Sequence, residues 1–435
     1  MTAPATLPAE VQGLLQRAAE ASRQGAAQEA ARLLQEAGRR APGHPSVENA
    51  LGLAAQRAGD HAAAARHYQR ATVADPLALP LWINLAAARR ALGDAAGEEE
   101  ALRHALEIDQ RDFMANLRLA ELHERVGDLP RATQRWNGVL MLAAQMPERP
   151  PGLEPVLAHA RAFVAGQMAA FGDAMEAGLD PLRSPLSLRE RRRFDACLDA
   201  VLGRRQIYHN VCEGVHFPFL PADEFFDRAD FPWFAQLEAA TPVIRAELKG
   251  LMASGFDGLE PYVAMAPGTP ANKWSPLDHK LDWSAFFLWK LGQRIDTACE
   301  RCPETTRIVE ALPLADMPGR GPTVFFSLIR PRTRLPAHTG VSNVRAIVHL
   351  PLIVPEGCGF RVGGETRAWR EGEAFAFDDT IEHEAWNDSD ELRAILILDT
   401  WNPHLSEAER ALMRRFFQVA DASGHNPHGR TAVAD

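Results

Sequence analysis

A repeating glycine is the feature that most constrains how this 435-residue chain folds. Gly25, Gly59, Gly93 and Gly127 follow one another at a spacing of 34 residues, and aspartate follows the last three of them. Glycine is common where a helix ends, because it adopts left-handed backbone angles without strain. The spacing therefore predicts a row of helix pairs with a glycine at the turn inside each pair.

Small and aromatic residues recur at fixed offsets between these glycines. The second unit shows the fullest set, with Leu51, Gly52, Ala64, Tyr68, Ala71 and Pro76. A 34-residue period of this content is similar to the tetratricopeptide repeat. Each such unit buries its apolar face only by stacking on a neighbour. We therefore predict an α-solenoid over residues 1–145.

Proline and strand-forming segments divide the rest of the chain. The cluster MPERPPGLEP at 146–155 cannot continue a helix, and helical spacing returns after it, so residues 146–206 are predicted to be a helical linker. From about 207 the chain is rich in aromatic residues and proline, and helices are expected at 235–252 and 283–302. Seven short apolar segments separated by turn residues follow: 323–329, 343–354, 359–364, 366–370, 373–378, 382–387 and 392–401. They predict a compact antiparallel barrel or jelly roll within residues 207–435. The fold class expected is α+β and multidomain.

Two of these strands carry arginine on a face that is otherwise apolar. Alternation places Arg345 on one face with Ile347 and His349, and places Arg393 with aliphatic residues. A charged side chain that faces a barrel interior is costly unless it meets a partner or a ligand. An anionic ligand would explain Arg393, and also Arg345 together with His349.

Two further histidines frame this region. His338 precedes one strand and His383 lies 45 residues later. Imidazole ligands with open positions suit Fe(II), and a nearby arginine suits a dicarboxylate cosubstrate. Gly340, however, stands where a His-x-Asp or His-x-Glu iron site would have its carboxylate.

The stretch HTGVSNVRAIVHLPLIVP, followed by FDDTIEHEAWNDSDELRAILILDTWNP, resembles the aspartyl/asparaginyl β-hydroxylase family of Fe(II)/2-oxoglutarate oxygenases. The resemblance covers about 207–405. It implies a double-stranded β-helix with an HxG … H metal motif, in which the glycine at 340 is a feature of the class. Tetratricopeptide repeats can precede the oxygenase domain in this family.

The resemblance also implies roles for individual residues. His338 and His383 match the two iron ligands. Arg393 with Ser327 matches the pair that binds the distal carboxylate of 2-oxoglutarate, and His349 matches a contact to its iron-chelating end. Arg345 matches the position that holds a carboxylate of the substrate. Ile347 stands where the family often has a second arginine, which leaves the chelating carboxylate one charged contact fewer.

The function expected is that of a 2-oxoglutarate-dependent dioxygenase that uses Fe(II) and O₂ and releases succinate and CO₂. Its expected substrate is Asp or Asn of a peptide or protein, hydroxylated at the β-carbon, with the repeats as a recognition surface. The alternatives are the same chemistry on a free amino acid, a lipid acyl chain or a natural-product intermediate, halogenation through chloride beside Gly340, and a repeat scaffold without catalysis.

Composition limits the partners and the location. The net charge of −10 argues against general affinity for nucleic acid or anionic lipid. Neither a secretory signal nor an apolar run long enough to span a membrane is visible in the sequence. Five cysteines, an odd number in a long chain, fit a reducing cytoplasm.

Overall fold

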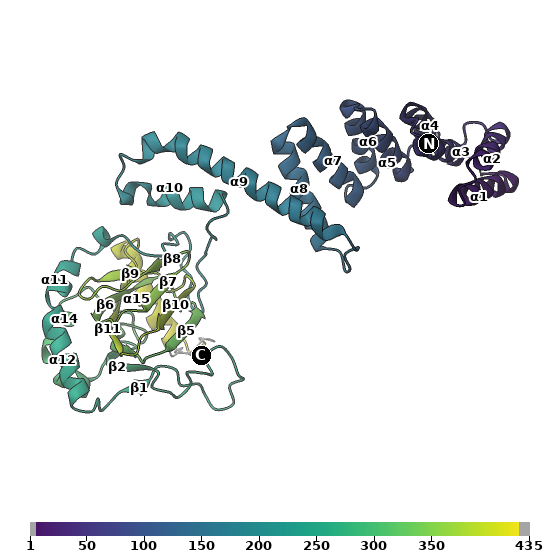
Figure 1. Cartoon of the computed structure of the whole chain (residues 1–435). Helices are drawn as coiled ribbons and strands as arrows, with labels where there is room; N and C mark the ends of the chain where they lie inside the picture. Colours follow the sequence, from purple (N-terminus) through teal and green to yellow (C-terminus); the bar gives the residue numbers. More distant parts are fainter. Residues whose placement is uncertain (1–5, 426–435) are drawn as a thin grey trace. The chain divides into compact units, whose positions relative to one another are not determined.

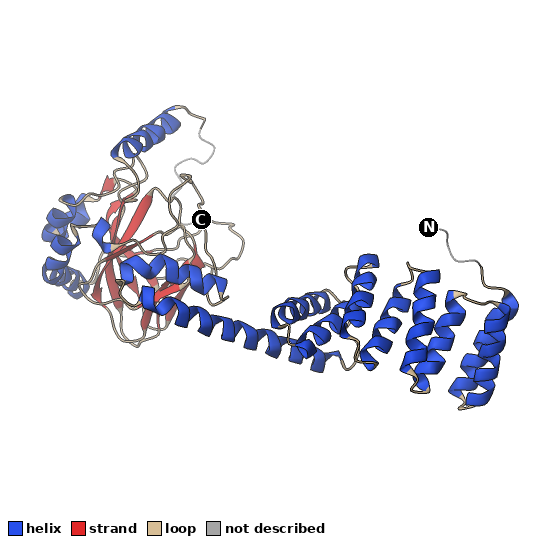
Figure 2. Cartoon of the chain, turned by 90° about the horizontal axis from the view of Figure 1, so that it is seen from above, coloured by secondary structure: helices blue, strands red, loops and turns tan. Residues whose placement is uncertain are grey.

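The structure is a computed structural model that describes residues 6–425. The chain divides into two compact units, Met1–Pro185 and Leu186–Asp435. The described part of the first unit contains helices and loops only, and the strands belong to the second unit (Figure 2). The expected order, a helical repeat followed by a sheet-rich domain, is confirmed.

The described part of the first unit consists of four successive helix pairs and one longer helix (Figure 1). These helices are α1 (Ala9–Arg23), α2 (Ala27–Arg40), α3 (Pro45–Arg57), α4 (His61–Ala74), α5 (Leu79–Ala91), α6 (Ala95–Ile108), α7 (Phe113–Val126), α8 (Leu129–Ala144) and α9 (Leu153–Arg183). Proline-rich residues separate α8 from α9, yet α9 packs on α8 by burying Leu157 and Ala160 against Trp136.

The repeated Gly-Asp pair determines the turn inside the helix pairs. All four glycines have left-handed backbone angles, with φ between 73° and 80°. Asp60, Asp94 and Asp128 each begin the following helix by accepting a hydrogen bond from the backbone N–H three residues later, at 2.8–3.2 Å. Glycine thus lets the chain reverse, and aspartate satisfies an N–H group that the new helix leaves unpaired.

Between residues 186 and 425, the second unit contains two antiparallel sheets. The larger has the strand order β1-β2-β4-β11-β6-β9 with β3 beside β2, and the smaller has the order β5-β10-β7-β8. The strands are β1 (Glu260–Pro261), β2 (Trp283–Lys290), β3 (Gln293–Arg294), β4 (Val324–Ile329), β5 (Thr333–His338), β6 (Arg345–Ile353), β7 (Cys358–Val362), β8 (Glu365–Arg367), β9 (Phe375–Phe377), β10 (His383–Asn387) and β11 (Arg393–Trp401).

Helices cover the outer face of the larger sheet. The helices of this unit are α10 (Leu188–Val201), η1 (Arg228–Asp230), α11 (Phe234–Ala239), α12 (Thr241–Ala253), α13 (Asp296–Arg301), α14 (Pro303–Glu310) and α15 (Glu407–Ala422). Leu248 of α12 packs in one apolar cluster with Val348 and Leu396 of the sheet. Ile347 and Phe360, from the two sheets, share a second cluster. The predicted alternation along residues 344–349 is therefore confirmed, because one face of β6 meets the helices and the other faces the smaller sheet.

The predicted helix at 283–302 is wrong for its first half. Residues 283–290 form strand β2, and only Asp296–Arg301 are helical. A short, largely apolar run such as this one has the same composition in a buried strand and in a buried helix, so periodicity does not separate them. Leu291 and Gly292, with φ of 52° and 83°, form the turn that ends the strand.

Two other segments differ from the expectation in detail. The helix at 235–252 is interrupted at Ala240, two residues before Pro242, because proline lacks the N–H that a continuous helix needs. Strand β5 was not predicted, and it contains Pro336. It lies at the edge of the smaller sheet, where proline is tolerated because one side of the strand makes no ladder bonds.

In the described part of the chain, no helix is both long and apolar enough to cross a membrane.

The packing of Gly52 gives a stability prediction. A Cβ atom added here would meet the buried Tyr68 ring at 2.6 Å, whereas one added at Gly138 of α8 would meet nothing within 4 Å. Gly52→Ala should lower the free energy of unfolding by about 1–3 kcal/mol through overpacking. Gly138→Ala should raise it by about 0.5–1 kcal/mol, because alanine favours the helix. Urea unfolding followed by circular dichroism measures both, and equal effects would contradict this packing.

Candidate active site

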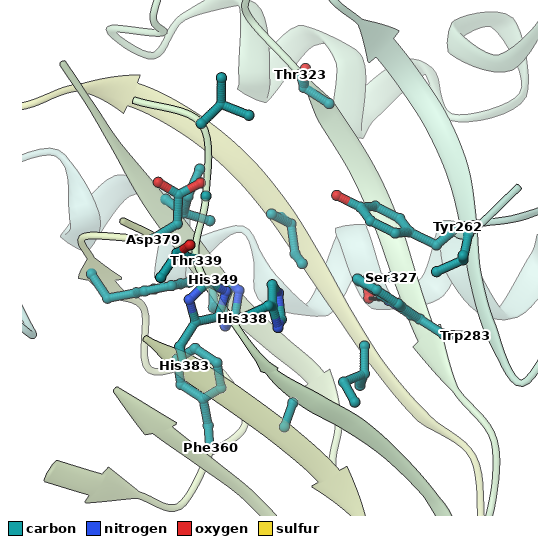
Figure 3. Close-up of a pocket in the computed structure, with 18 of the residues that line it drawn as sticks. Tyr262, Trp283, Thr323, Ser327, His338, Thr339, His349, Phe360, Asp379 and His383 are labelled. Carbon is teal, nitrogen blue, oxygen red and sulfur yellow. Dashed lines mark hydrogen bonds between the residues drawn. The ribbon is translucent and has the colours of Figure 1, made fainter. Parts of the chain in front are cut away.

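A cavity of about 160 Å³ lies between the two sheets. Figure 3 shows three histidines on one side of it and Ser327, Trp283 and Tyr262 on the other. The six residues singled out from the sequence all line this cavity, namely Ser327, His338, Arg345, His349, His383 and Arg393. The fold therefore brings together residues that are up to 66 positions apart in the chain.

Pairing of β5 with β10 places the two candidate iron ligands side by side. His338 ends β5, His383 begins β10, and the two are direct partners in the ladder. Their ring centroids are 4.0 Å apart. If the register of β5 against β10 slipped by one residue, the two rings would lie on opposite faces of the sheet. The observed register therefore brings them together.

Each of these rings has one nitrogen fixed by the backbone. Nδ1 of His338 lies 2.8 Å from the carbonyl oxygen of Pro336, and Nδ1 of His383 lies 3.0 Å from that of Ile381. A carbonyl only accepts, so Nδ1 carries the proton and the Nε2 lone pair of each ring is left for a metal. Burial lowers the pKa of His338 well below its usual value and that of His383 to about 4, so both rings are neutral.

No third protein ligand joins the pair: residues 6–425 contain no group of three or more His, Cys, Asp or Glu side chains that could hold a metal. Gly340 explains part of this. A Cβ atom at Gly340 would collide with the Asp379 carboxylate, which occupies that space, and the backbone N–H of Gly340 donates to the Asp379 carbonyl oxygen at 2.6 Å. Two neutral imidazoles with open positions fit Fe(II).

Among the described residues, Arg393 is a buried cation without a counterion. It is 2% exposed, and its Nη1 donates to the carbonyl oxygen and to the hydroxyl oxygen of Ser327, both at 3.3 Å. Within residues 6–425, no carboxylate forms an ion pair with it, and its Nε has no hydrogen-bond partner. Burial lowers the pKa of Arg393 to about 9, which still leaves it charged at neutral pH. Such a charge fits a site for an anion.

His349 is held by a residue that the sequence did not single out. The Nε1–H of Trp369 donates to Nδ1 of His349 at 3.3 Å, and the same indole lies 4.4 Å from the Arg393 guanidinium. Nδ1 is therefore the acceptor and Nε2 carries the proton, because burial lowers the pKa of His349 well below its usual value and keeps it neutral. His349 thus offers a donor on its Nε2 side.

Arg345 has an environment opposite to that of Arg393. Its Nη2 donates to Asp379 at 3.0 Å and its Nη1 to Asp399 at 3.3 Å, and all three side chains are buried. Burial opposes the charge on Arg345, but the two carboxylates outweigh it and keep the pKa of Arg345 above its usual value. Burial raises the pKa of Asp399 to about 6 against the lowering effect of Arg345.

Aromatic rings form the wall opposite the histidines. Tyr262 stacks on Trp283 with centroids 3.8 Å apart, and Trp274 packs edge-on against His338 at 4.8 Å. The Nε1–H of Trp283 donates to the Ser327 hydroxyl oxygen at 3.3 Å, so this wall also orients the serine beside Arg393.

Sequence reasoning missed Trp369, Tyr262, Asp399 and the contact of Asp379 with Arg345. A signal for Asp399 was present, because it follows Arg393 by six residues and alternation puts both on one face of β11. A buried acid at the end of an aliphatic strand requires a partner. For Trp369 and Tyr262 no local signal exists, since both come from segments whose path over the sheets is not readable from periodicity.

Parts of this chain are similar to known proteins. Residues 238–403 match the family described as aspartyl/asparaginyl beta-hydroxylase. The human aspartyl/asparaginyl beta-hydroxylase is 41% identical over 135 residues, which are 31% of this chain and 18% of that protein. The ornithine lipid ester-linked acyl 2-hydroxylase of Rhizobium tropici is 34% identical over 186 residues, which are 42% of this chain and 62% of that protein. A crystal structure of MamA aligns with 36% of this chain and 84% of its own, at a TM-score of 0.31 and 14% identity.

The chain thus spans less than two thirds of the length of the human hydroxylase and of the Rhizobium tropici hydroxylase. The matched region contains both candidate iron ligands, the two buried arginines and Ser327. The resemblance that the motifs indicated is confirmed: residues 238–403 of this chain match the aspartyl/asparaginyl beta-hydroxylase family.

Proposed function

We propose that this chain is a hydroxylase that depends on Fe(II) and 2-oxoglutarate, built on a double-stranded β-helix formed by the two sheets. The single observation that carries the proposal is the buried charge of Arg393, which has no counterion in the described part of the chain and lies on the same cavity as two neutral histidines. A dicarboxylate that reaches Arg393 with one end and a metal at the histidines with the other satisfies both.

Each residue has a definite task in this scheme. His338 and His383 hold the iron through Nε2, and their Nδ1 contacts fix the ring orientation. Arg393 and Ser327 bind the distal carboxylate of 2-oxoglutarate, and His349 donates to its chelating end. Bound Fe(II) with 2-oxoglutarate supplies the activation of O₂, with release of succinate and CO₂ and insertion of one oxygen atom into a C–H bond of the substrate.

The proposal also assigns a role to the repeats. Thr72, Val73, Pro76, Leu77, Trp82, His104, Glu107 and Ile108 line a cavity of about 450 Å³ on the first unit. Val73 is 75% exposed and Leu77 is 66% exposed, and exposed apolar side chains gathered at one hollow favour contact with another chain. We propose that the repeats bind a polypeptide that is the substrate or carries it, as the sequence led us to expect.

The free thiols of all five cysteines support the expected location in the reducing cytoplasm.

The metal ligands give the first test of the function. His338→Ala and His383→Ala should each abolish Fe(II)-dependent formation of succinate from 2-oxoglutarate, because a single imidazole does not retain the ion. Metal titration calorimetry with Mn(II) should show the same loss of binding. His209→Ala, an exposed histidine, is the matched control. Turnover of 2-oxoglutarate by the double-alanine variant would show that the metal lies elsewhere.

Arg393 gives the second test. Arg393→Met should raise the KM for 2-oxoglutarate by tens to hundreds of fold, because a charge-assisted contact in a closed site contributes about 2–4 kcal/mol. Arg393→Lys should restore this KM only in part, since an ammonium group lacks the planar fork. Steady-state succinate assays measure both, with the exposed Arg330→Met as control. An unchanged KM in both variants would place the cosubstrate elsewhere.

The repeats give the third test, which needs the substrate identified first by mass spectrometry of peptides and cell extract for a gain of one oxygen. A chain that begins at Gly152 should keep substrate-independent turnover of 2-oxoglutarate, while its KM for the polypeptide substrate rises sharply. An unchanged kcat/KM for that substrate would mean that the repeats do not recognise it.

A further inference from the structure

A buried tryptophan connects the two ends of the proposed cosubstrate site. Trp369 lies between β8 and β9, where the chain passes from the smaller sheet to the larger one, and it is 4% exposed. Its indole contacts both Arg393 and His349, the residues proposed for the distal carboxylate and for the chelating end of 2-oxoglutarate. A role for Trp369 toward the cosubstrate therefore rests on the proposed function.

The segment that carries Trp369 is tied to β6, the strand that carries His349. The backbone N–H of Gly372 donates to a carbonyl oxygen of β6 at 2.9 Å. The Glu371 carboxylate accepts from the backbone N–H of Val354, directly after β6, at 3.1 Å. Because both contacts join this segment to the same strand, they hold the indole in place relative to His349.

The face of the indole contacts Arg393. The guanidinium carbon lies 4.4 Å from the ring centroid, which is within the range of a cation–π interaction. Within residues 6–425, the guanidinium donates only to Ser327. An aromatic face attracts a cation most strongly where water is excluded, and unlike a carboxylate it does so without cancelling the charge. The ring thus holds Arg393 and leaves its charge for an anionic ligand.

The edge of the same indole contacts His349. Its Nε1–H donates to Nδ1 of His349 at 3.3 Å, so the proton of the neutral imidazole is on Nε2. Figure 3 shows His349 on the side of the cavity where the two candidate iron ligands lie. Since Ile347 offers no charge, His349 is the donor that the proposed function leaves for the chelating end. Without the indole, Nδ1 would be a buried acceptor that has lost its partner.

We propose that Trp369 is a positioning residue for both ends of 2-oxoglutarate: the face of its indole holds Arg393, and its N–H group holds His349. Trp369 acts only through these two residues and does not itself bind the cosubstrate. Because the two actions use different parts of the ring, substitutions separate them. Phenylalanine keeps an aromatic face and lacks the N–H group, whereas leucine lacks both.

The test measures binding to the full chain loaded with Mn(II), by titration calorimetry under nitrogen, so that no turnover occurs. The probes are 2-oxoglutarate and 2-oxobutyrate, which has the same chelating end but lacks the distal carboxylate. The Kd of 2-oxobutyrate reports on the chelating end. The ratio of the Kd of 2-oxobutyrate to that of 2-oxoglutarate reports on the contact of the distal carboxylate with Arg393.

Trp369→Phe should raise both Kd values by about fivefold, the effect of one lost hydrogen bond, and leave their ratio unchanged. Trp369→Leu should raise the Kd of 2-oxobutyrate by the same factor. It should also lower the ratio by about fivefold, because Arg393 loses the aromatic face. An unchanged Kd of 2-oxobutyrate in Trp369→Phe, or an equal ratio in the two variants, would overturn the proposal.

Trp386→Phe is the matched control. This ring also lies under an arginine, with the Arg334 guanidinium 5.7 Å from its centroid, but it is not among the described residues that line the cavity. Neither Kd should change in this variant. A change of both in Trp386→Phe equal to that in Trp369→Phe would mean that any loss of an indole loosens the domain, and would overturn the specific role of Trp369.

Nitrogen NMR of the metal-free chain gives a readout that needs neither metal nor cosubstrate. The Nδ1 resonance of His349 is assigned by its absence in His349→Gln. In Trp369→Phe it should move toward the position of an imidazole nitrogen that accepts no hydrogen bond, and in Trp386→Phe it should stay. No movement in Trp369→Phe would show that the indole does not hold His349. This measurement stands even if Trp369→Leu does not fold.

Failure of the proposed function would be seen separately. It would appear as a wild-type chain that binds neither Mn(II) nor 2-oxoglutarate. The role of Trp369 fails instead through the pattern of the Kd values in a chain that binds both, or through an unmoved His349 resonance.

Discussion

The ladder between β5 and β10 is the constraint on which the rest of the site depends. It makes His338 and His383 direct partners across two short strands, so their rings meet without help from a loop. β5 is an edge strand that contains Pro336, whose carbonyl oxygen also fixes the ring of His338. The same proline that hid this strand from sequence reasoning therefore helps to orient a candidate metal ligand.

Two arginines on adjacent strands of the larger sheet show how burial alone does not define a ligand site. Arg345 and Arg393 are both almost inaccessible to solvent. The difference lies in their neighbours, since two aspartates surround one and a serine and an indole the other. Trp369 is central to the second environment because it contacts Arg393 and His349 at once. By donating to Nδ1 of His349, Trp369 leaves the proton of that ring on Nε2, so that His349 remains a donor although the nearby Ile347 supplies no charge.

Much of this architecture could be predicted from the sequence, for reasons that particular residues make clear. The spacing of Gly25 to Gly127 predicts the helix pairs, because each glycine and the aspartate after it carry out a local backbone task. Alternation predicts which side chains of β6 face the cavity, because successive side chains of any strand point to opposite faces. The strand at 283–290 and the contact of Asp379 with Arg345 could not be predicted, because they depend on which strands pair and on what packs across the cavity. The sequence motif identified Arg345, but only the fold shows that its charge is already balanced.

Gly340 and Asp379 compete for one volume, and this bears on how such a site can change over generations of mutation. A carboxylate introduced at position 340 would need the space that the Asp379 side chain holds. Withdrawing Asp379 would in turn leave Arg345 with one counterion fewer. A change from this pair of candidate histidine ligands to a site with a third, acidic ligand is therefore not a single step for this chain. It requires at least two coordinated replacements, and either one alone passes through a less stable intermediate sequence.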